Sequence, residues 1–198
     1  MKEKKSKTSI FLTNWKRKFS CYKYSFLEFL ALKSKFFYNI LMGWRKPVFL
    51  KEIKMSKVTE NDFVLFIGAG ILPSESILIS EITNAKVVSI DNNKIACGHA
   101  KKYVKKRGIS DKVIIKFADG IDFPLSKYNV IFIAINVWPI EGVLNNLSKN
   151  LKKGTRVMCK SYEEDIIKVL EKENLRDSFK LESKIQNPQT QSFLLIKK

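Results

Sequence analysis

Short apolar runs and amphipathic stretches alternate along residues 62–198, and this alternation predicts strands and helices in turn. The apolar runs are rich in β-branched and aromatic residues, as is typical of buried parallel strands. Strands are expected at residues 63–67, 87–90, 113–117, 128–135 and 155–159. The run 128–135 is the most hydrophobic and should lie centrally. The pattern predicts an α/β fold with a mostly parallel sheet.

The segments between these runs have helical spacing, and the end of the chain has a different pattern. Helices are expected at residues 73–82, 92–107, 138–151 and 163–174. Lysines near the end of the second helix suit its dipole, and Gly108 suits the position that follows it, so this charged run indicates a solvated helix. Residues 179–185 and 192–197 flank Asn187-Pro188 and predict an antiparallel pair that closes the sheet.

The first 60 residues differ from the rest, so we divide the chain into a helical extension, 1–60, and a domain, 61–198. Residues 25–42 have helical propensity, but charged side chains interrupt them, so no run of about 18 apolar residues exists and no membrane span is expected. A break is expected between Gly43 and Pro47, because a residue before proline disfavours helix. A further short helix is expected at residues 48–57.

The positive charge of the chain is concentrated in the extension. The net charge is +18, and residues 1–60 hold 15 Lys or Arg against 4 Glu, a local charge of +11 with aromatic residues interleaved. Three interpretations remain open: helices that form a lid over a ligand pocket, a surface that binds RNA, and a helix that lies on an anionic membrane. Lysine enrichment of the whole chain, without any polyanionic partner, explains the charge equally well.

Cysteine and histidine usage excludes several site types. Cys21, Cys97 and Cys159 are far apart and form no metal-binding pair, which indicates free thiols in a reducing, cytoplasmic setting. His99 is the sole histidine and is expected on a surface helix. No metal site is expected.

Candidate chemistry centres on residues 62–91, which predict a strand, a glycine turn, a helix, a second strand and an acid. Gly68, Ala69 and Gly70 allow the backbone to approach a ligand closely, and Pro73 suits a first helical residue. Asp91 follows at the tip of the second strand, where a carboxylate can accept hydrogen bonds from ribose hydroxyls. The third glycine of a dinucleotide motif is absent, which favours S-adenosylmethionine (SAM) over NAD.

Further polar residues follow the ends of the later predicted strands. Asp119 and Gly120 follow the third strand, and Asp119 can accept from an adenine amino group or only cap its turn. Ligands of such sheets bind beyond the carboxyl ends of the strands, so neighbouring residues join the candidate set. The candidates for SAM binding also include Asn92 and Asn136, and the catalytic candidates, by position alone, are Asn136 and Tyr162.

Residues 62–198 resemble class I SAM-dependent methyltransferases, and most closely the nicotianamine synthase family. The stretch Phe66-Ile67-Gly68-Ala69-Gly70-Ile71-Leu72-Pro73 is similar to that family's Ile-Gly-x-Gly-Pro-Leu-Pro turn, in which the Leu-Pro pair is the more specific part. The acids Asp91 and Asp119 stand at the expected positions. The segments Lys160-Ser161-Tyr162 and 191–197 are also similar.

This resemblance implies a Rossmann-like class I methyltransferase fold with an antiparallel strand near the C-terminus. It also implies that the 3-amino-3-carboxypropyl group of SAM is transferred to an amine of a small molecule. The sequence departs from the family at Ile71, which replaces a proline, and its extension is shorter than the family's helical domain. Tyr22, Tyr24 and Glu28 are therefore lid candidates by position only, with packing or surface roles as the alternative.

Two other functions remain open from the sequence. One is methyl transfer from SAM to a small molecule or RNA, which is the usual chemistry of the superfamily. The other is a basic module for RNA or membrane binding with a vestigial SAM pocket. Oligomeric state and the identity of the acceptor are not encoded in any pattern.

Overall fold

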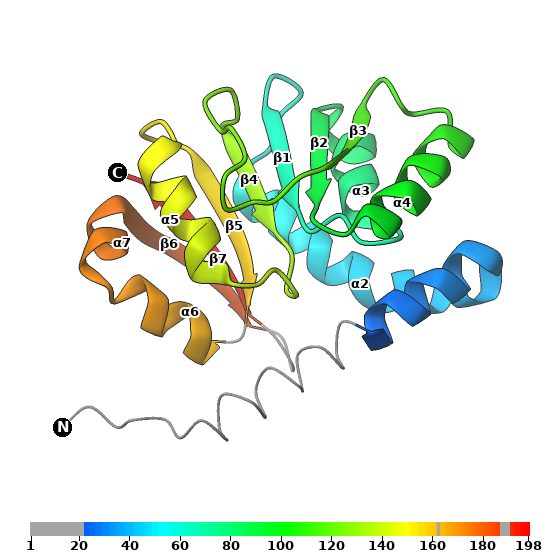
Figure 1. The fold of residues 1–198 in the computed structure, drawn as a ribbon, viewed down its shortest axis with the longest axis horizontal. Coiled ribbons are helices and arrows are strands. Elements are labelled where there is room, and N and C mark those ends of the chain that lie inside the picture. The colour runs from blue at the N-terminus through cyan, green and yellow to red at the C-terminus, as the bar shows by residue number, and fades with distance from the viewer. Residues whose placement is uncertain (1–21, 162, 187–190) are drawn as a thin grey trace.

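A seven-stranded sheet organises the part of the chain that the structure, a computed structural model, describes: residues 22–161, 163–186 and 191–198. The strand order is β3-β2-β1-β4-β5-β7-β6 (Figure 1). Strands β1 to β5 are parallel, and β7 runs antiparallel to both neighbours, as predicted. The strands are β1 (Phe63–Ile67), β2 (Lys86–Asp91), β3 (Val113–Phe117), β4 (Val130–Ile133), β5 (Arg156–Ser161), β6 (Phe179–Gln186) and β7 (Gln191–Lys197).

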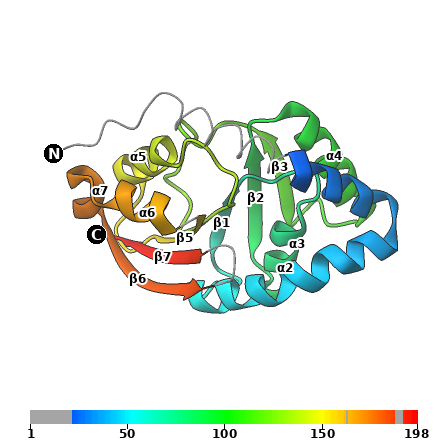
Figure 2. The same ribbon diagram turned by 90° about the horizontal axis from the view of Figure 1, so that it is seen from below.

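Helices cover both faces of the sheet (Figure 2). Alternate strand residues such as Val64, Phe66 and Phe132 pack against α2 and α3, while Leu65, Ile131 and their neighbours pack on the other face against α5 to α7. The strand β4 lies in the middle of the sheet, as its hydrophobicity predicted. The helices are residues 22–33, α2 (Lys35–Ser56), α3 (Ser74–Thr83), α4 (Lys94–Lys106), α5 (Ile140–Asn150), α6 (Glu163–Leu170) and α7 (Glu173–Ser178).

The predicted break at Gly43 to Pro47 is wrong, because α2 continues through both residues. A proline inside a helix removes one backbone hydrogen bond and crowds the carbonyl four positions earlier, here that of Gly43, so Pro47 weakens α2 locally. Burial of Phe49 and Ile53 against the sheet then stabilises the last turns of the helix. The chain breaks instead at Ser34, whose φ of −136° and ψ of 124° are extended.

Smaller differences fall at element ends. The segment predicted as one helix, 163–174, forms α6 and α7, and β4 is shorter than the apolar run 128–135. Pro73 is the N-cap of α3 rather than its first helical residue. Asn93 caps α4 by accepting hydrogen bonds from the Ile95 and Ala96 N–H groups.

A buried polar cluster fastens α2 to the sheet. Glu52 is buried, and its Oε1 accepts a 2.5 Å hydrogen bond from Ser192 Oγ in β7 and lies 3.2 Å from Lys160 Nζ in β5. Burial raises the pKa of Glu52, an effect that the Lys160 charge opposes but does not cancel. The helix thus has a fixed position over the strands.

Within the described residues no helix is long and apolar enough to span a bilayer. Cys97 and Cys159 are buried free thiols, and burial raises the pKa of Cys159 to about 12, so that it stays protonated. Cys21 lies outside the described residues.

Candidate active site at the carboxyl ends of the strands

The glycine turn after β1 folds back onto the end of β2. The N–H groups of Gly68 and Ala69 both donate to the Ile90 carbonyl, at 2.8 and 3.0 Å. Gly68 has a φ of +95°, and a Cβ there would lie 2.9 Å from both Ala134 Cβ and Val137 Cγ2. Glycine is therefore required twice, by the backbone conformation and by the close approach of the segment after β4.

Asp91 completes this turn. Its Oδ2 accepts a 2.9 Å hydrogen bond from Gly70 N–H, and its Oδ1 accepts one of 2.8 Å from Asn93 N–H. Each carboxylate oxygen can accept two hydrogen bonds, so each keeps one site for a ligand hydroxyl. Asp91 is half-buried at the strand end and is held in one orientation.

Asp119 lies at the end of the adjacent strand, on the same edge of the sheet. Phe117 pairs with Asp91 in register, and the Ala118 N–H donates to the Asp91 carbonyl at 3.1 Å. Asp119 Oδ1 accepts from the Ile121 N–H at 3.0 Å, so this carboxylate does cap its turn, and Oδ2 has no protein donor among the described residues. The structure therefore brings the two predicted acids together.

Gly120 follows Asp119 and packs closely against β1. A Cβ at Gly120 would lie 2.9 Å from Ile67 Cγ2, and the Gly120 carbonyl accepts from Asn146 Nδ2 at 2.9 Å. Sequence reasoning missed Asn146, whose amide also donates to Phe123 O and so fixes the loop that carries Asp119. In the sequence, the one indication of this role is a polar residue between Leu144 and Leu147 of a predicted amphipathic helix.

The remaining predicted site residues lie around the same edge. Asn92 is exposed between β2 and α4, Asn136 is half-buried in the turn after β4, and Pro73 is buried at the start of α3. Tyr162 lies outside the described residues, so its predicted catalytic role stays a prediction.

Glu28 is the most informative residue of the extension, because it reaches the glycine turn from helix 22–33. It is 8% exposed, and its Oε2 accepts from the N–H groups of Ile71 at 3.0 Å and Leu72 at 3.4 Å. Oε2 also lies 2.8 Å from where a Cβ of residue 70 would be, so Gly70 makes room for it. Glu28 is thus part of the site, and not a surface residue.

Burial raises the pKa of Glu28, although the neighbouring Arg45 guanidinium opposes this shift. Arg45 Nη1 lies 2.9 Å from Glu28 Oε1, and its guanidinium carbon lies 5.5 Å from the centre of the Tyr24 ring. Of the lid candidates, Tyr24 therefore supports the ion pair, whereas Tyr22 is 76% exposed.

A second acid, Glu75 in α3, lies near Arg45 and near Lys160 of β5. Burial opposes its charge, but the nearby Arg45 and Lys160 charges lower its pKa. The site therefore has alternating charges, with Glu28, Glu75 and Glu52 interleaved with Arg45 and Lys160. No local sequence pattern indicates that Arg45, Glu75 and Lys160 act together, since they come from three separate elements.

The helix 22–33 also contacts α4. The rings of Phe29 and His99 meet edge to face, with centroids 6.2 Å apart. His99 is half-buried on α4, so the expected surface position holds only in part. Together with Glu28, this contact holds the helix across the glycine turn.

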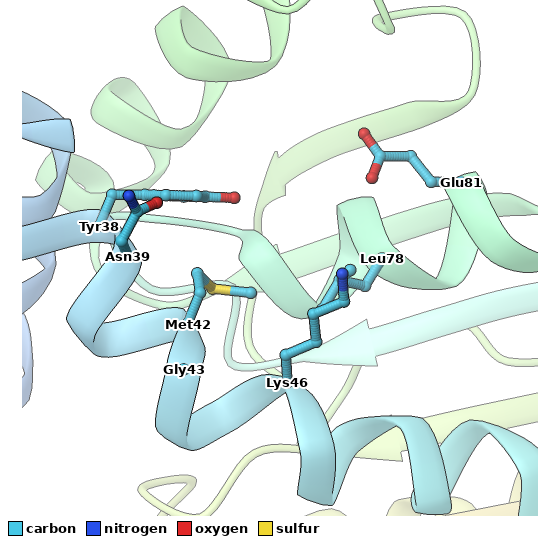
Figure 3. Close-up of a pocket in the computed structure, with 7 residues that line it drawn as sticks. All are labelled: Tyr38, Asn39, Met42, Gly43, Lys46, Leu78 and Glu81. Carbon is cyan, nitrogen blue, oxygen red and sulfur yellow. The ribbon is translucent and has the colours of Figure 1, made fainter. Parts of the chain in front are cut away.

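A separate pocket of about 400 Å³ lies between α2 and α3, away from the strand ends (Figure 3). Its polar side chains include Lys46 and Glu81, and Glu81 forms a 2.5 Å ion pair with Arg107. None of the predicted SAM-binding residues lines it. The residues that line it are Tyr38, Asn39, Met42, Gly43, Lys46, Leu78 and Glu81.

Comparison with known proteins points to one family. The profile of the nicotianamine synthase protein family matches residues 50–192. A sterol 24-C-methyltransferase of Pneumocystis carinii (strain B80) is 27% identical over 156 residues, which are 64% of this chain and 41% of that protein. The chain thus spans less than half the length of that curated relative.

Solved structures show the same fold. A mutant of MtNAS in complex with S-adenosylmethionine superposes with a TM-score of 0.73 at 19% identity, covering 91% of this chain and 76% of that one. MtNAS in complex with MTA and tNA gives a TM-score of 0.68 at 18% identity, with coverages of 84% and 67%. An RNA methyltransferase from Salinibacter ruber in complex with S-adenosyl-L-homocysteine gives 0.62 at 18% identity, with coverages of 77% and 92%.

The close contact at Gly68 gives a testable prediction. Gly68→Ala should destabilise the protein more than Gly154→Ala, because both positions have a positive φ, +95° and +83°, but only Gly68 has atoms within 3 Å of the new methyl group. The shared backbone strain costs about 1–3 kcal/mol. Urea denaturation measures the difference, and equal losses of unfolding free energy would show that the turn tolerates a side chain.

Proposed function

The chain belongs to the nicotianamine synthase family, and we propose that it transfers the 3-amino-3-carboxypropyl group of SAM to an amine of a small molecule. The observation that carries this proposal is the family match, which includes the glycine turn with its buried Leu72-Pro73 pair. The likeness in fold to MtNAS, which has been seen with SAM and with MTA and tNA, supports it.

The geometry of the strand ends suits the adenosine part of SAM. Asp91 offers one acceptor site on each oxygen to the two ribose hydroxyls, and the free Oδ2 of Asp119 accepts from the adenine amino group. Asn92 and Gly120, which follow the two acids in the chain, are proposed to contact the same ligand. The methionine part is proposed to lie against the turn of Gly68, Ala69 and Gly70, beside the Glu28 carboxylate that occupies the space next to Gly70.

The reaction is a substitution at carbon. The lone pair of the acceptor nitrogen forms a C–N bond to the aminocarboxypropyl group while its C–S bond breaks. The bonding electrons neutralise the sulfonium and release methylthioadenosine, and one proton leaves the new ammonium nitrogen. A sulfonium is a good leaving group, so the protein's main tasks are alignment of the two reactants and removal of that proton.

Glu28 is placed to accept this proton. Its carboxyl lies at the glycine turn, beside the proposed position of the methionine part, and burial raises its pKa towards the range in which a carboxylate serves as a base. Arg45 orients it through the 2.9 Å ion pair. Asn136, after the central strand, and Tyr162 remain the other proposed catalytic residues.

Methyl transfer is the second candidate, and it is favoured by the sterol 24-C-methyltransferase relative. Both reactions use the same adenosine-binding residues. They differ in which carbon of SAM the acceptor nitrogen approaches, and therefore in the product released.

Product analysis separates these two functions. The full chain, incubated with SAM and a small-molecule cell extract, should release methylthioadenosine, which mass spectrometry distinguishes from S-adenosylhomocysteine. Release of S-adenosylhomocysteine would establish methyl transfer instead. Binding of SAM without release of either product would show that the chain only binds SAM, and would contradict both proposed reactions.

Asp91→Asn should weaken SAM binding by about 1.5–3 kcal/mol, roughly 10- to 100-fold, because a charged acceptor is lost. An asparagine has one acceptor oxygen, whereas Asp91 already serves two backbone N–H groups through two oxygens. Isothermal titration calorimetry measures the affinity, with Asp111→Asn in an exposed turn as the matched control. Equal affinity of the two variants for SAM would show that Asp91 does not bind the ribose.

Glu28→Gln should lower turnover by about 10²- to 10⁴-fold while SAM affinity changes little. The wild-type rate should rise with pH through the pKa of Glu28, which lies above 4.5, since only the deprotonated carboxyl accepts a proton. The variant should lack this rise. Glu81→Gln, on the surface of α3, is the control. A pH profile of Glu28→Gln identical to that of the wild type would exclude Glu28 as the base.

A further inference from the structure

The edge of the sheet opposite the proposed SAM site is lined with lysines. Each of the five parallel strands has a lysine near its amino end: one is the first residue of β2, and the others precede β1, β3, β4 and β5. The amino ends of these strands form the upper edge of the sheet in Figure 1. The side chains belong to Lys57, Lys86, Lys112, Lys127, Lys152 and Lys153. All except the half-buried Lys112 are exposed. We refer to these six residues as the lysine row.

Carboxylates offset little of this charge. Asp62 is buried and occupied, with a 2.6 Å ion pair to Arg156 and a hydrogen bond from Asn129. The exposed acids near this edge are Glu60, Asp111 and Glu182, of which Glu182 interacts with Lys57. Among the described residues, Lys86, Lys152 and Lys153 have no carboxylate within ion-pairing distance, so their charges face solvent.

A hollow of about 400 Å³ lies within the row, at the start of β4 and β5. Its lining is polar and cationic, and it includes backbone and side-chain donors as well as ammonium groups. It is lined by Ser126, Lys127, Tyr128, Asn129, Lys152, Lys153, Gly154, Thr155 and Arg156. Arg156 is fixed there by two backbone carbonyls and by the Asp62 carboxylate that pairs with its charge, so it gives the hollow a rigid wall.

An exposed aromatic ring stands beside the hollow. Phe63, the first residue of β1, is 54% exposed, although it begins a strand whose other residues are buried. Its N–H donates at 2.9 Å to Asn129 Oδ1, and Asn129 lines the hollow. Lys86 is its register partner on β2, so the ring lies between the hollow and an exposed lysine.

From this arrangement we propose that the lysine row and Phe63 bind a single-stranded nucleic acid. The row crosses five neighbouring strands, from β3 to β5, about 19 Å at the usual strand spacing, which accommodates a few nucleotides. The ammonium groups bind the phosphates, and a base stacks on Phe63. A membrane surface fits less well, because the hollow is concave and is lined mainly by polar and cationic residues.

The test uses the full chain and a labelled 20-nucleotide oligouridylate, with affinity measured by fluorescence anisotropy at several salt concentrations. The double variant Lys152→Ala with Lys153→Ala should make the slope of log affinity against log salt less steep by about 1.4, because each lost phosphate contact removes about 0.7. Phe63→Ala should weaken binding about tenfold with an unchanged slope, since stacking is not ionic.

The matched control removes the same charge elsewhere, with Lys101→Ala and Lys102→Ala on the exposed side of α4. An equal change of the salt slope in the control would show that the effect comes from the overall charge of +18, and would overturn the proposal. So would binding to phosphatidylserine vesicles without binding to the oligonucleotide, or an unchanged affinity in the Phe63 variant. All variants should bind SAM as the wild type does, because the SAM site lies at the other ends of the strands.

A second measurement needs no variant. Photocrosslinking of a 4-thiouridine oligomer to the wild-type protein, mapped by mass spectrometry, should label residues 63, 126–130 or 152–156. Crosslinks confined to residues 1–50 would place the nucleic acid on the extension, away from the lysine row, and overturn this assignment.

Discussion

The backbone hydrogen bonds between the glycine turn and the end of β2 are the constraint on which the site depends. Three consecutive N–H groups, those of Gly68, Ala69 and Gly70, donate to the Ile90 carbonyl and the Asp91 carboxylate. The turn can reach these acceptors only with positive φ at both glycines. The same contacts orient Asp91, bring the segment after β4 close, and leave the space that Glu28 enters.

The extension completes this site from outside the domain. Glu28 bonds to the turn, Arg45 pairs with Glu28, and Glu52 joins α2 to β5 and β7 through Lys160 and Ser192. Breaking a buried charge pair leaves an uncompensated charge, so each member depends on its partner. This interlocking explains why two helices with many exposed aromatic residues hold a fixed position against the domain.

The two edges of the sheet differ in chemistry. The carboxyl ends of the strands carry Asp91 and Asp119, which suit an adenosine, whereas the amino ends carry the lysine row, which suits phosphates. About one strand length, roughly 15 Å, separates them. An enzyme of this family could therefore hold a polyanion without occupying its donor site, because the two surfaces share no residue.

The sequence by itself determined the succession of strands and helices along the chain, the closing antiparallel pair, the glycine turn and the two acids. These features depend on local periodicity and on positions at strand ends. Only the tertiary structure decided the continuity of α2 through Pro47, the placement of Glu28 in the turn, and the cluster of Arg45, Glu75 and Lys160. Those features depend on burial and on contacts between residues far apart in the chain, which no local pattern encodes.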